Sequence, residues 1–226
     1  MHNFTLVNCD TDSIMVCKPD QSEFTNEEQT LLLKELKRLF PEQISWEPDG
    51  YYQRVIIAKA KNYVLYDGKK LTHKGSALKA STKEPALKEF IQLILDAMIN
   101  KQTNYTEIYN KYVKEINDVQ DIKRWVSRKT ISATTLSSER ENEAKIVRAI
   151  EGSDYKEGDR VYMYFTSDGE LKLVEKFSND YCKNTLYGKL YKTAEVFETI
   201  LPVKEVFPNF SLKRNKKKLE ELLNGT

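Results

Sequence analysis

Residues 6–16 read Leu-Val-Asn-Cys-Asp-Thr-Asp-Ser-Ile-Met-Val, in which an acidic triplet stands between two short apolar runs. Apolar runs of this length are typical of buried strands. The sequence therefore predicts a hairpin whose turn carries Asp10 and Asp12, one on each side of Thr11. Because side chains alternate along a strand, both carboxylates can point the same way. Two anionic oxygen ligands at one place suit Mg²⁺ or Mn²⁺, and a cation would relieve the repulsion between them.

An Asp-x-Asp triplet also has other settings. It occurs in metal-dependent glycosyltransferases, in calcium loops and in turns where Asp bonds its own backbone. The calcium-loop interpretation fails, because that loop needs further acidic residues, a glycine at its sixth position and a distal glutamate. The glycosyltransferase interpretation lacks a nucleotide-binding α/β pattern before the triplet. The plain turn interpretation stays open for Asp10.

Composition limits the class of protein. The chain has 226 residues, 40% of them hydrophobic and 31% charged, which suits one large domain or two small ones. No apolar stretch approaches the ~20 residues that a membrane-spanning helix needs, and Met1-His2-Asn3 does not start a signal peptide. Three cysteines without metal-site spacing argue against a disulfide framework. We therefore expect a cytoplasmic protein with no membrane partner.

Basic residues cluster although the formal net charge is only +2. They form two groups, which are Lys59, Lys61, Lys69, Lys70 and Lys74, and then Lys213, Arg214, Lys216, Lys217 and Lys218. A local basic stripe on a near-neutral protein indicates a polyanionic partner. A solvated surface is the alternative for any single lysine run.

Hydrophobic periodicity divides the chain near residues 75–84, which form a polar connector. Before it, Thr25 and Glu28 have the spacing of a capping box, and Pro41 ends the helix that they start. Strand patterns separated by turns follow as far as Lys74. After the connector, helical patterns dominate and one hairpin is expected. The expected helices cover 85–98, 103–116, 138–150 and 186–200, and the expected strands cover 160–166 and 171–174. The sequence therefore predicts an α+β fold.

Five short motifs follow one another along nearly the whole chain. They are Asn8-Cys9-Asp10-Thr11-Asp12-Ser13, Ala60-Lys61-Asn62-Tyr63, His73-Lys74-Gly75, residues 122–132 and Gly158-Asp159-Arg160-Val161. In this order and spacing they resemble the palm and thumb of a family B DNA polymerase. The family carries Tyr-Gly-Asp-Thr-Asp-Ser on a palm hairpin, then a Lys-Lys-Arg-Tyr strand and a Lys-Gly motif at the start of the thumb.

The resemblance implies a specific fold and chemistry. Residues 1–75 would be the C-terminal part of the palm, an antiparallel sheet with a helix. Residues 76–226 would be a mostly helical thumb with a small β-hairpin. The implied activity is the transfer of dNTPs to a primer 3′-hydroxyl with two Mg²⁺ ions, or Mn²⁺. Asp10 and Asp12 would be the catalytic metal ligands, with Asp12 bridging the ions.

The resemblance also implies contacts with primer–template DNA. The residues concerned are Lys61, Tyr63, Lys74, Gly75, Lys79, Arg128, Lys129 and Thr130. Several have structural alternatives that the sequence leaves open. Tyr63 could be a core aromatic residue, Gly75 a turn residue, and Arg128 and Lys129 a solvated charge pair.

The chain departs from the family in ways that affect its activity. The family's Asp-x-x-Ser-Leu-Tyr-Pro and Lys-x-x-x-Asn-Ser-x-Tyr-Gly motifs do not occur in it, and no exonuclease region precedes the palm. We therefore expect a split-gene subunit, a truncated gene or an expressed fragment that is inactive alone. It would need a second polypeptide carrying the rest of the palm, the fingers and the exonuclease, in the cytoplasm or at a site of viral or phage replication. The alternative is a non-catalytic duplex-binding fragment or regulatory module.

Overall fold

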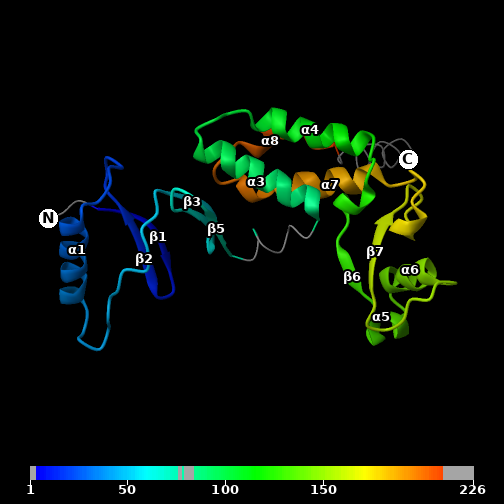
Figure 1. The fold of residues 1–226 in the computed structure, drawn as a ribbon, viewed down its shortest axis with the longest axis horizontal. Coiled ribbons are helices and arrows are strands. Elements are labelled where there is room, and N and C mark those ends of the chain that lie inside the picture. The colour runs from blue at the N-terminus through cyan, green and yellow to red at the C-terminus, as the bar shows by residue number, and fades with distance from the viewer. Residues whose placement is uncertain (1–3, 76–77, 79–83, 211–226) are drawn as a thin grey trace, which may run out of the picture. The chain divides into compact units, whose positions relative to one another are not determined.

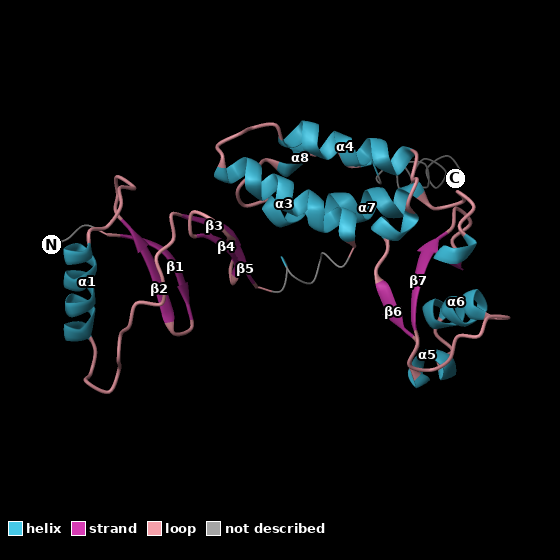
Figure 2. Ribbon diagram, viewed as in Figure 1, coloured by secondary structure: helices cyan, strands magenta, loops and turns pink. Residues whose placement is uncertain are grey.

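The structure is a computed structural model that describes residues 4–75, 78 and 84–210. The chain forms two compact units, Met1–Gly75 and Ser76–Thr226. The described residues form seven α-helices and three small antiparallel sheets, so the predicted α+β class is confirmed (Figures 1 and 2). No helix within these ranges is long and apolar enough to cross a membrane.

The first unit begins with the predicted hairpin. Strand β1 (Thr5–Asp10) pairs antiparallel with β2 (Ser13–Cys17), and helix α1 (Asn26–Leu39) follows. The predicted capping box is confirmed, because Glu28 N donates to Thr25 Oγ1 at 3.2 Å and Thr25 N donates to the Glu28 carboxylate at 2.8 Å. An ion pair of 2.7 Å between Lys18 and Glu28 joins the end of the hairpin to the start of the helix.

A second sheet completes this unit. Strands β3 (Arg54–Lys59), β4 (Asn62–Tyr66) and β5 (Leu71–Lys74) pair in the order β3-β4-β5, separately from β1 and β2. The single antiparallel sheet expected for residues 1–75 is therefore divided into two sheets. Among residues 4–75 the buried ones lie only on β3 and β4, namely Ala58, Asn62, Tyr63, Val64 and Leu65.

The core of the second unit lies between helices α3 (Pro85–Ile99), α4 (Tyr105–Asn117) and α7 (Lys183–Ala194). The expected apolar face of α3 is buried, and Phe90 makes edge-on ring contacts with Tyr112 at 5.5 Å and Tyr109 at 6.0 Å. Helix α4 begins at Tyr105 rather than at residue 103 as expected; its N-cap is Asn104, whose side chain makes no capping bond. The chain then closes on this core through η3 (Glu195–Phe197) and α8 (Val203–Val206).

A smaller core lies under the sheet of strands β6 (Arg128–Thr130), β7 (Arg160–Phe165) and β8 (Leu171–Leu173). Val161, Met163 and Ile131 pack in one cluster with residues of helix α6 (Glu141–Ile150). Helix α5 (Ala133–Ser137) and strand β6 were not expected from the sequence. The predicted hairpin is therefore a three-stranded sheet.

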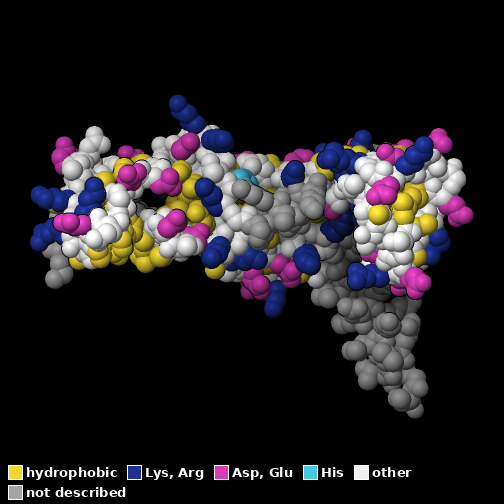
Figure 3. Space-filling model, turned by 90° about the horizontal axis from the view of Figure 1, so that it is seen from below, with side chains coloured by type: hydrophobic (Ala, Val, Ile, Leu, Met, Phe, Trp, Pro, Cys, Tyr) yellow, Lys and Arg dark blue, Asp and Glu magenta, His cyan; other side chains and the backbone are white. Residues whose placement is uncertain are grey.

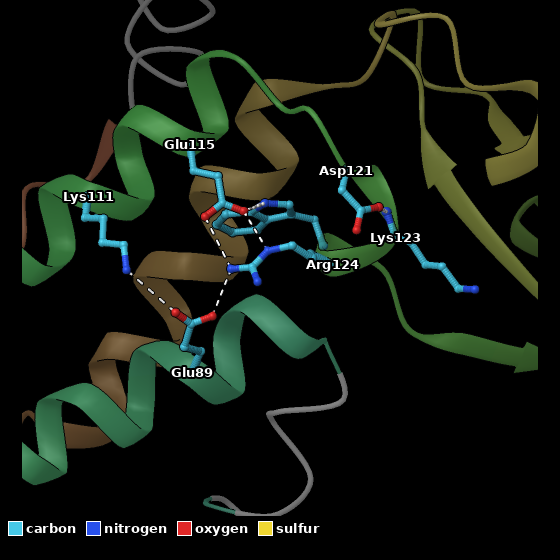
Figure 4. A network of polar contacts seen from close by, with 7 residues as sticks. Glu89, Lys111, Glu115, Asp121, Lys123 and Arg124 are labelled. Carbon is cyan, nitrogen blue, oxygen red and sulfur yellow. Dashed lines mark hydrogen bonds and ion pairs between the residues drawn. The ribbon is translucent and has the colours of Figure 1, made fainter.

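An ion-pair network links α3, α4 and the short helix η1 (Ile122–Trp125), as Figure 4 shows. Arg124 pairs with Glu115 at 3.0 Å and with Glu89 at 2.9 Å, and the fully buried Trp125 donates to Glu115 at 2.9 Å. Burial raises the pKa of Glu89, but the hydrogen bond and charge of Arg124 outweigh it, so the net shift is downward. The network fixes η1, which precedes β6.

A second polar cluster joins β7 and β8 to the segment before α7. The Asp180 carboxylate accepts from the Tyr164 hydroxyl at 2.6 Å and from Lys172 Nζ at 2.9 Å. Burial raises the pKa of Asp180, but these hydrogen bonds outweigh it and lower the pKa to about 2.

We expect Asp180→Asn to remove a pH-dependent part of the stability. A carboxyl whose folded pKa lies below its unfolded value stabilises the fold above the unfolded pKa, and this contribution is lost as pH falls towards about 2. At neutral pH the variant should lose about 1 kcal/mol, because the side chain is 36% exposed. Urea unfolding at several values between about pH 7 and pH 2 should show that the free energies of unfolding of the two proteins converge as the pH falls. A difference in free energy of unfolding that stayed constant over this pH range would contradict the lowered pKa of Asp180.

Candidate metal-binding hairpin and nucleic-acid interface

The two predicted metal ligands lie at the tip of the β1–β2 hairpin. Asp10 ends β1 and pairs with Ser13, so Thr11 and Asp12 form a two-residue turn. Thr11 has φ +31°, and its hydroxyl donates to Asp10 Oδ1 at 3.3 Å. The Ser13 hydroxyl donates to the Asp10 carbonyl at 3.2 Å. The position of the hairpin agrees with the prediction, but Asp12 lies in the turn, so strand alternation does not fix the direction of its side chain.

The carboxylates of this tip are available to a cation. Asp10 is half-buried, Asp12 is exposed, and neither forms an ion pair within the described residues. Mg²⁺ commonly binds through one or two carboxylates and keeps several waters, so this donor set fits one hydrated ion. The described part of the chain contains no group of three or more His, Cys, Asp or Glu side chains arranged to hold a metal. A two-ion site would need further ligands.

Lys61 and Tyr63, two of the predicted DNA contacts, lie in different settings. Lys59 pairs with Asn62, which leaves Ala60 and Lys61 as a tight turn, and Lys61 has φ +59°. Tyr63 lies on β4, where only 7% of its surface is exposed. The burial of Tyr63 agrees with the alternative that it is a packing residue.

The structure brings Lys61 close to the end of β5. Lys74 is exposed and pairs with Tyr63 across the strands. Gly75 follows with φ +94°, and a Cβ at this position would lie 2.1 Å from the carbonyl oxygen of Lys61. Residues from the second and third motifs therefore meet at one end of the three-stranded sheet. Gly75 has a structural role there, whatever it contacts.

The predicted thumb contacts are divided between two faces of β6. Arg128, Lys129 and Thr130 are all exposed, but side chains alternate along a strand, so Lys129 lies opposite to the other two. Neighbouring atoms desolvate Lys129 and lower the pKa of its ammonium group, and the charge of Lys189 adds to this effect. Lys79 and the basic residues from Lys213 onward lie outside the described residues.

Arg160 is a candidate that the sequence did not single out as a contact. It belongs to the motif at residues 158–161, and strand pairing places it opposite Thr130. The signal was obscured because a strand as short and polar as Arg-Lys-Thr has no apolar alternation.

No protein-family model matches the chain, and no curated protein is significantly similar to it. The resemblance to family B DNA polymerases therefore stands on the five motifs alone.

Proposed function

We propose that the chain is the C-terminal palm and thumb portion of a family B DNA polymerase. In this proposal the first unit is the partial palm and the second unit is the thumb, which grips the primer–template duplex. The observation that carries the proposal is a pair of carboxylates at the tip of a tight hairpin, neither of which forms an ion pair with a described residue. In the reaction the primer 3′-hydroxyl attacks the α-phosphorus of a dNTP, so that the nucleoside monophosphate joins the primer and pyrophosphate leaves.

The residues of the hairpin tip have distinct parts in this chemistry. Asp10 and Asp12 would hold Mg²⁺ or Mn²⁺, which when bound activates the primer hydroxyl and stabilises the leaving group. Asp10 is fixed by its strand pairing with Ser13, whereas Asp12 lies in the turn and is exposed to solvent. Lys61 and Lys74 place two ammonium groups at one end of the neighbouring sheet, where they would neutralise backbone phosphates.

The surface of the first unit supports a role for a further protein segment. None of residues 4–57 is buried, and large apolar side chains of this region are exposed (Figure 3). They are Leu6, Leu31, Leu39, Phe40, Ile44 and Tyr51. A two-stranded hairpin is marginally stable by itself, and exposed apolar surface marks an interaction site. We propose that the rest of the palm covers this surface and supplies a further carboxylate, together with the fingers and exonuclease.

A second candidate is a non-catalytic duplex-binding fragment or regulatory module. The observation that favours it is the limited donor set, because the described residues offer two carboxylates at the hairpin tip. The two candidates differ in what Asp10 and Asp12 do. The catalytic proposal requires both carboxylates for metal binding, whereas the alternative predicts that neither matters for any function.

Primer extension beside a duplex-binding titration tests the proposal. We expect the chain alone to bind a recessed primer–template with strong salt dependence, because phosphate contacts release counterions. We expect no extension with Mg²⁺ and dNTPs in the absence of the remaining palm. Extension that is abolished in Asp12→Ala would show that these residues suffice and that no further carboxylate is needed. Absence of binding at low salt would contradict the proposal.

A further inference from the structure

A cavity of about 40 Å³ lies within the second unit, between the sheet of β6, β7 and β8, helix η1 and the start of α7 (Figure 1). Met163 and Phe165 of β7 and Leu171 of β8 line its sheet side, and Leu186 of α7 lines its helix side. Met163 and Leu186 are 5% and 4% exposed, so these walls are closely packed. The cavity therefore offers an apolar surface to a molecule that enters it.

Lysine side chains from two elements line the same cavity. Lys129 lies opposite Val161 in the β6–β7 pairing, so the two side chains share one face of the sheet. Met163 and Phe165 follow Val161 at alternate positions of β7 and belong to the same face. Lys189 of α7 also lines the cavity. Because Lys129 is exposed, its side chain connects the cavity with solvent.

The charges around the cavity are not balanced. Lys189 pairs with Glu84 at 2.9 Å, whereas Lys129 forms no ion pair with any described residue. Desolvation and the charge of Lys189 lower the pKa of Lys129, and the charge of Glu143 of α6 acts against them without cancelling them. Two ammonium groups therefore repel each other near a partly desolvated space. An anion bound there would relieve this repulsion.

The polar side chains and the volume of the cavity limit the kind of ligand. Ser127 and Thr185 also line it, and hydroxyl groups can donate to an anionic oxygen as ammonium groups do. A water needs about 10–15 Å³ of such space, so the cavity holds only about three or four non-hydrogen atoms. A ligand with a short aliphatic tail and one carboxylate at the opening suits both the walls and the lysines.

We propose that this cavity, the α7–sheet cavity, binds a short-chain monocarboxylate. The aliphatic tail lies against Met163 and Leu186, and the carboxylate accepts hydrogen bonds from Lys129. Lys189 stays paired with its glutamate and adds positive potential. A phosphate ion suits the cavity less well, because it has no apolar group to cover the walls and its charge is costly to desolvate.

The proposal goes beyond the proposed function and does not depend on it. Every residue that lines the cavity belongs to the second unit, so Asp10 and Asp12 play no part in it. It also gives Lys129 a role other than the DNA contact expected from the sequence.

Alkylation of the full chain by iodoacetamide at increasing propionate concentration tests the proposal. Sodium chloride keeps the ionic strength constant, and mass spectrometry follows each cysteine. Cys182 lines the cavity, whereas Cys9 is an exposed cysteine of the first unit. We expect saturating propionate to slow alkylation of Cys182 roughly fivefold or more and to leave that of Cys9 unchanged. The half-maximal concentration should be on the order of 1 mM, because so small a ligand makes few contacts.

Matched ligands and variants separate the charge of the ligand from its shape. Propionamide has the size of propionate without its charge, and phosphate has charge without the tail. Each should need a concentration roughly tenfold higher or more. Lys129→Met should raise the half-maximal propionate concentration roughly tenfold, whereas Lys129→Arg should keep it within about threefold. Lys156→Met is the control, because Lys156 is an exposed lysine of the same unit that does not line the cavity. It should leave the affinity unchanged.

Four outcomes would overturn the proposal. They are no slowing of Cys182 alkylation, equal slowing at Cys9, equal protection by propionamide or phosphate, and a Lys129→Met variant that binds like the unaltered chain or like Lys156→Met. Equal protection by phosphate would mean a general anion site. Thermal unfolding checks that each variant folds, and the comparison of propionate with propionamide needs no variant. The measurements use neither DNA nor a divalent ion, so a failure of the proposed function would leave their result unchanged.

Discussion

Replacement of Asp12 by asparagine is expected to weaken Mn²⁺ binding by the chain by roughly tenfold or more. Asparagine keeps the size of the side chain but offers one neutral oxygen in place of a charged carboxylate. Because Asp12 lies in an exposed turn, the hairpin should survive the change. Electron paramagnetic resonance of free Mn²⁺ in a titration measures the affinity directly.

The control for this prediction is Asp49→Asn. Asp49 is an exposed aspartate of the same unit in a Pro-Asp-Gly sequence, so it matches Asp12 in charge and setting. The Asp49→Asn variant should keep the Mn²⁺ affinity of the unaltered chain, whereas Asp10→Asn should weaken it as Asp12→Asn does. Equal losses in Asp12→Asn and Asp49→Asn would mean that Mn²⁺ binds to the general acidic surface. No loss in either Asp10→Asn or Asp12→Asn would favour the non-catalytic alternative.

The second large effect is expected at Gly75. Gly75→Ala should destabilise the first unit by about 2–4 kcal/mol, for two reasons that act together. Its φ of +94° is unfavourable for any residue with a Cβ, and that Cβ would lie 2.1 Å from the Lys61 carbonyl oxygen. Relief requires the β3–β4 turn and the end of β5 to separate. Urea unfolding measures the loss, and hydrogen exchange of residues 54–74 locates it.

Gly169→Ala separates the steric overlap from the backbone conformation. Gly169 has φ +90°, almost the same as Gly75, but nothing lies within 4 Å of an added Cβ. We expect this variant to cost only about 1 kcal/mol, from the left-handed backbone alone. If Gly75→Ala cost no more than Gly169→Ala, the close approach of Gly75 to Lys61 would be wrong.

Features with local causes could be predicted from the sequence. The hairpin at residues 6–16 follows from two apolar runs around a turn, and the start of α1 follows from the spacing of Thr25 and Glu28. The turn at Asp67 has the same kind of local cause, because its carboxylate accepts from the backbone N–H groups of Lys69 and Lys70 at 2.8 Å. Each of these depends on a few neighbouring residues.

Features that depend on distant residues could not be predicted. The leucines of α1 have the spacing of a buried face, yet Leu32, Leu33 and Leu36 are only half-buried and no residue of that helix is fully buried. Strand β6 forms only because β7 provides a pairing edge thirty residues later, as the pairing of Thr130 with Arg160 shows. The separation of Lys129 from Arg128 follows from that pairing. Likewise, the contact between Gly75 and Lys61 depends on the three-stranded sheet.

In the proposed function, Asp10 and Asp12 hold a divalent ion beside the primer terminus. Iron-dependent cleavage tests it most directly, because Fe²⁺ bound in place of Mg²⁺ generates hydroxyl radicals that cut nearby DNA without any need for nucleotide transfer. With a labelled primer–template, ascorbate and peroxide, we expect strand scission confined to the primer 3′ end. That scission should be lost in Asp12→Asn and kept in Asp49→Asn. Scission spread along the duplex, or the same pattern in Asp12→Asn, would contradict a metal site at Asp10 and Asp12 beside the primer terminus.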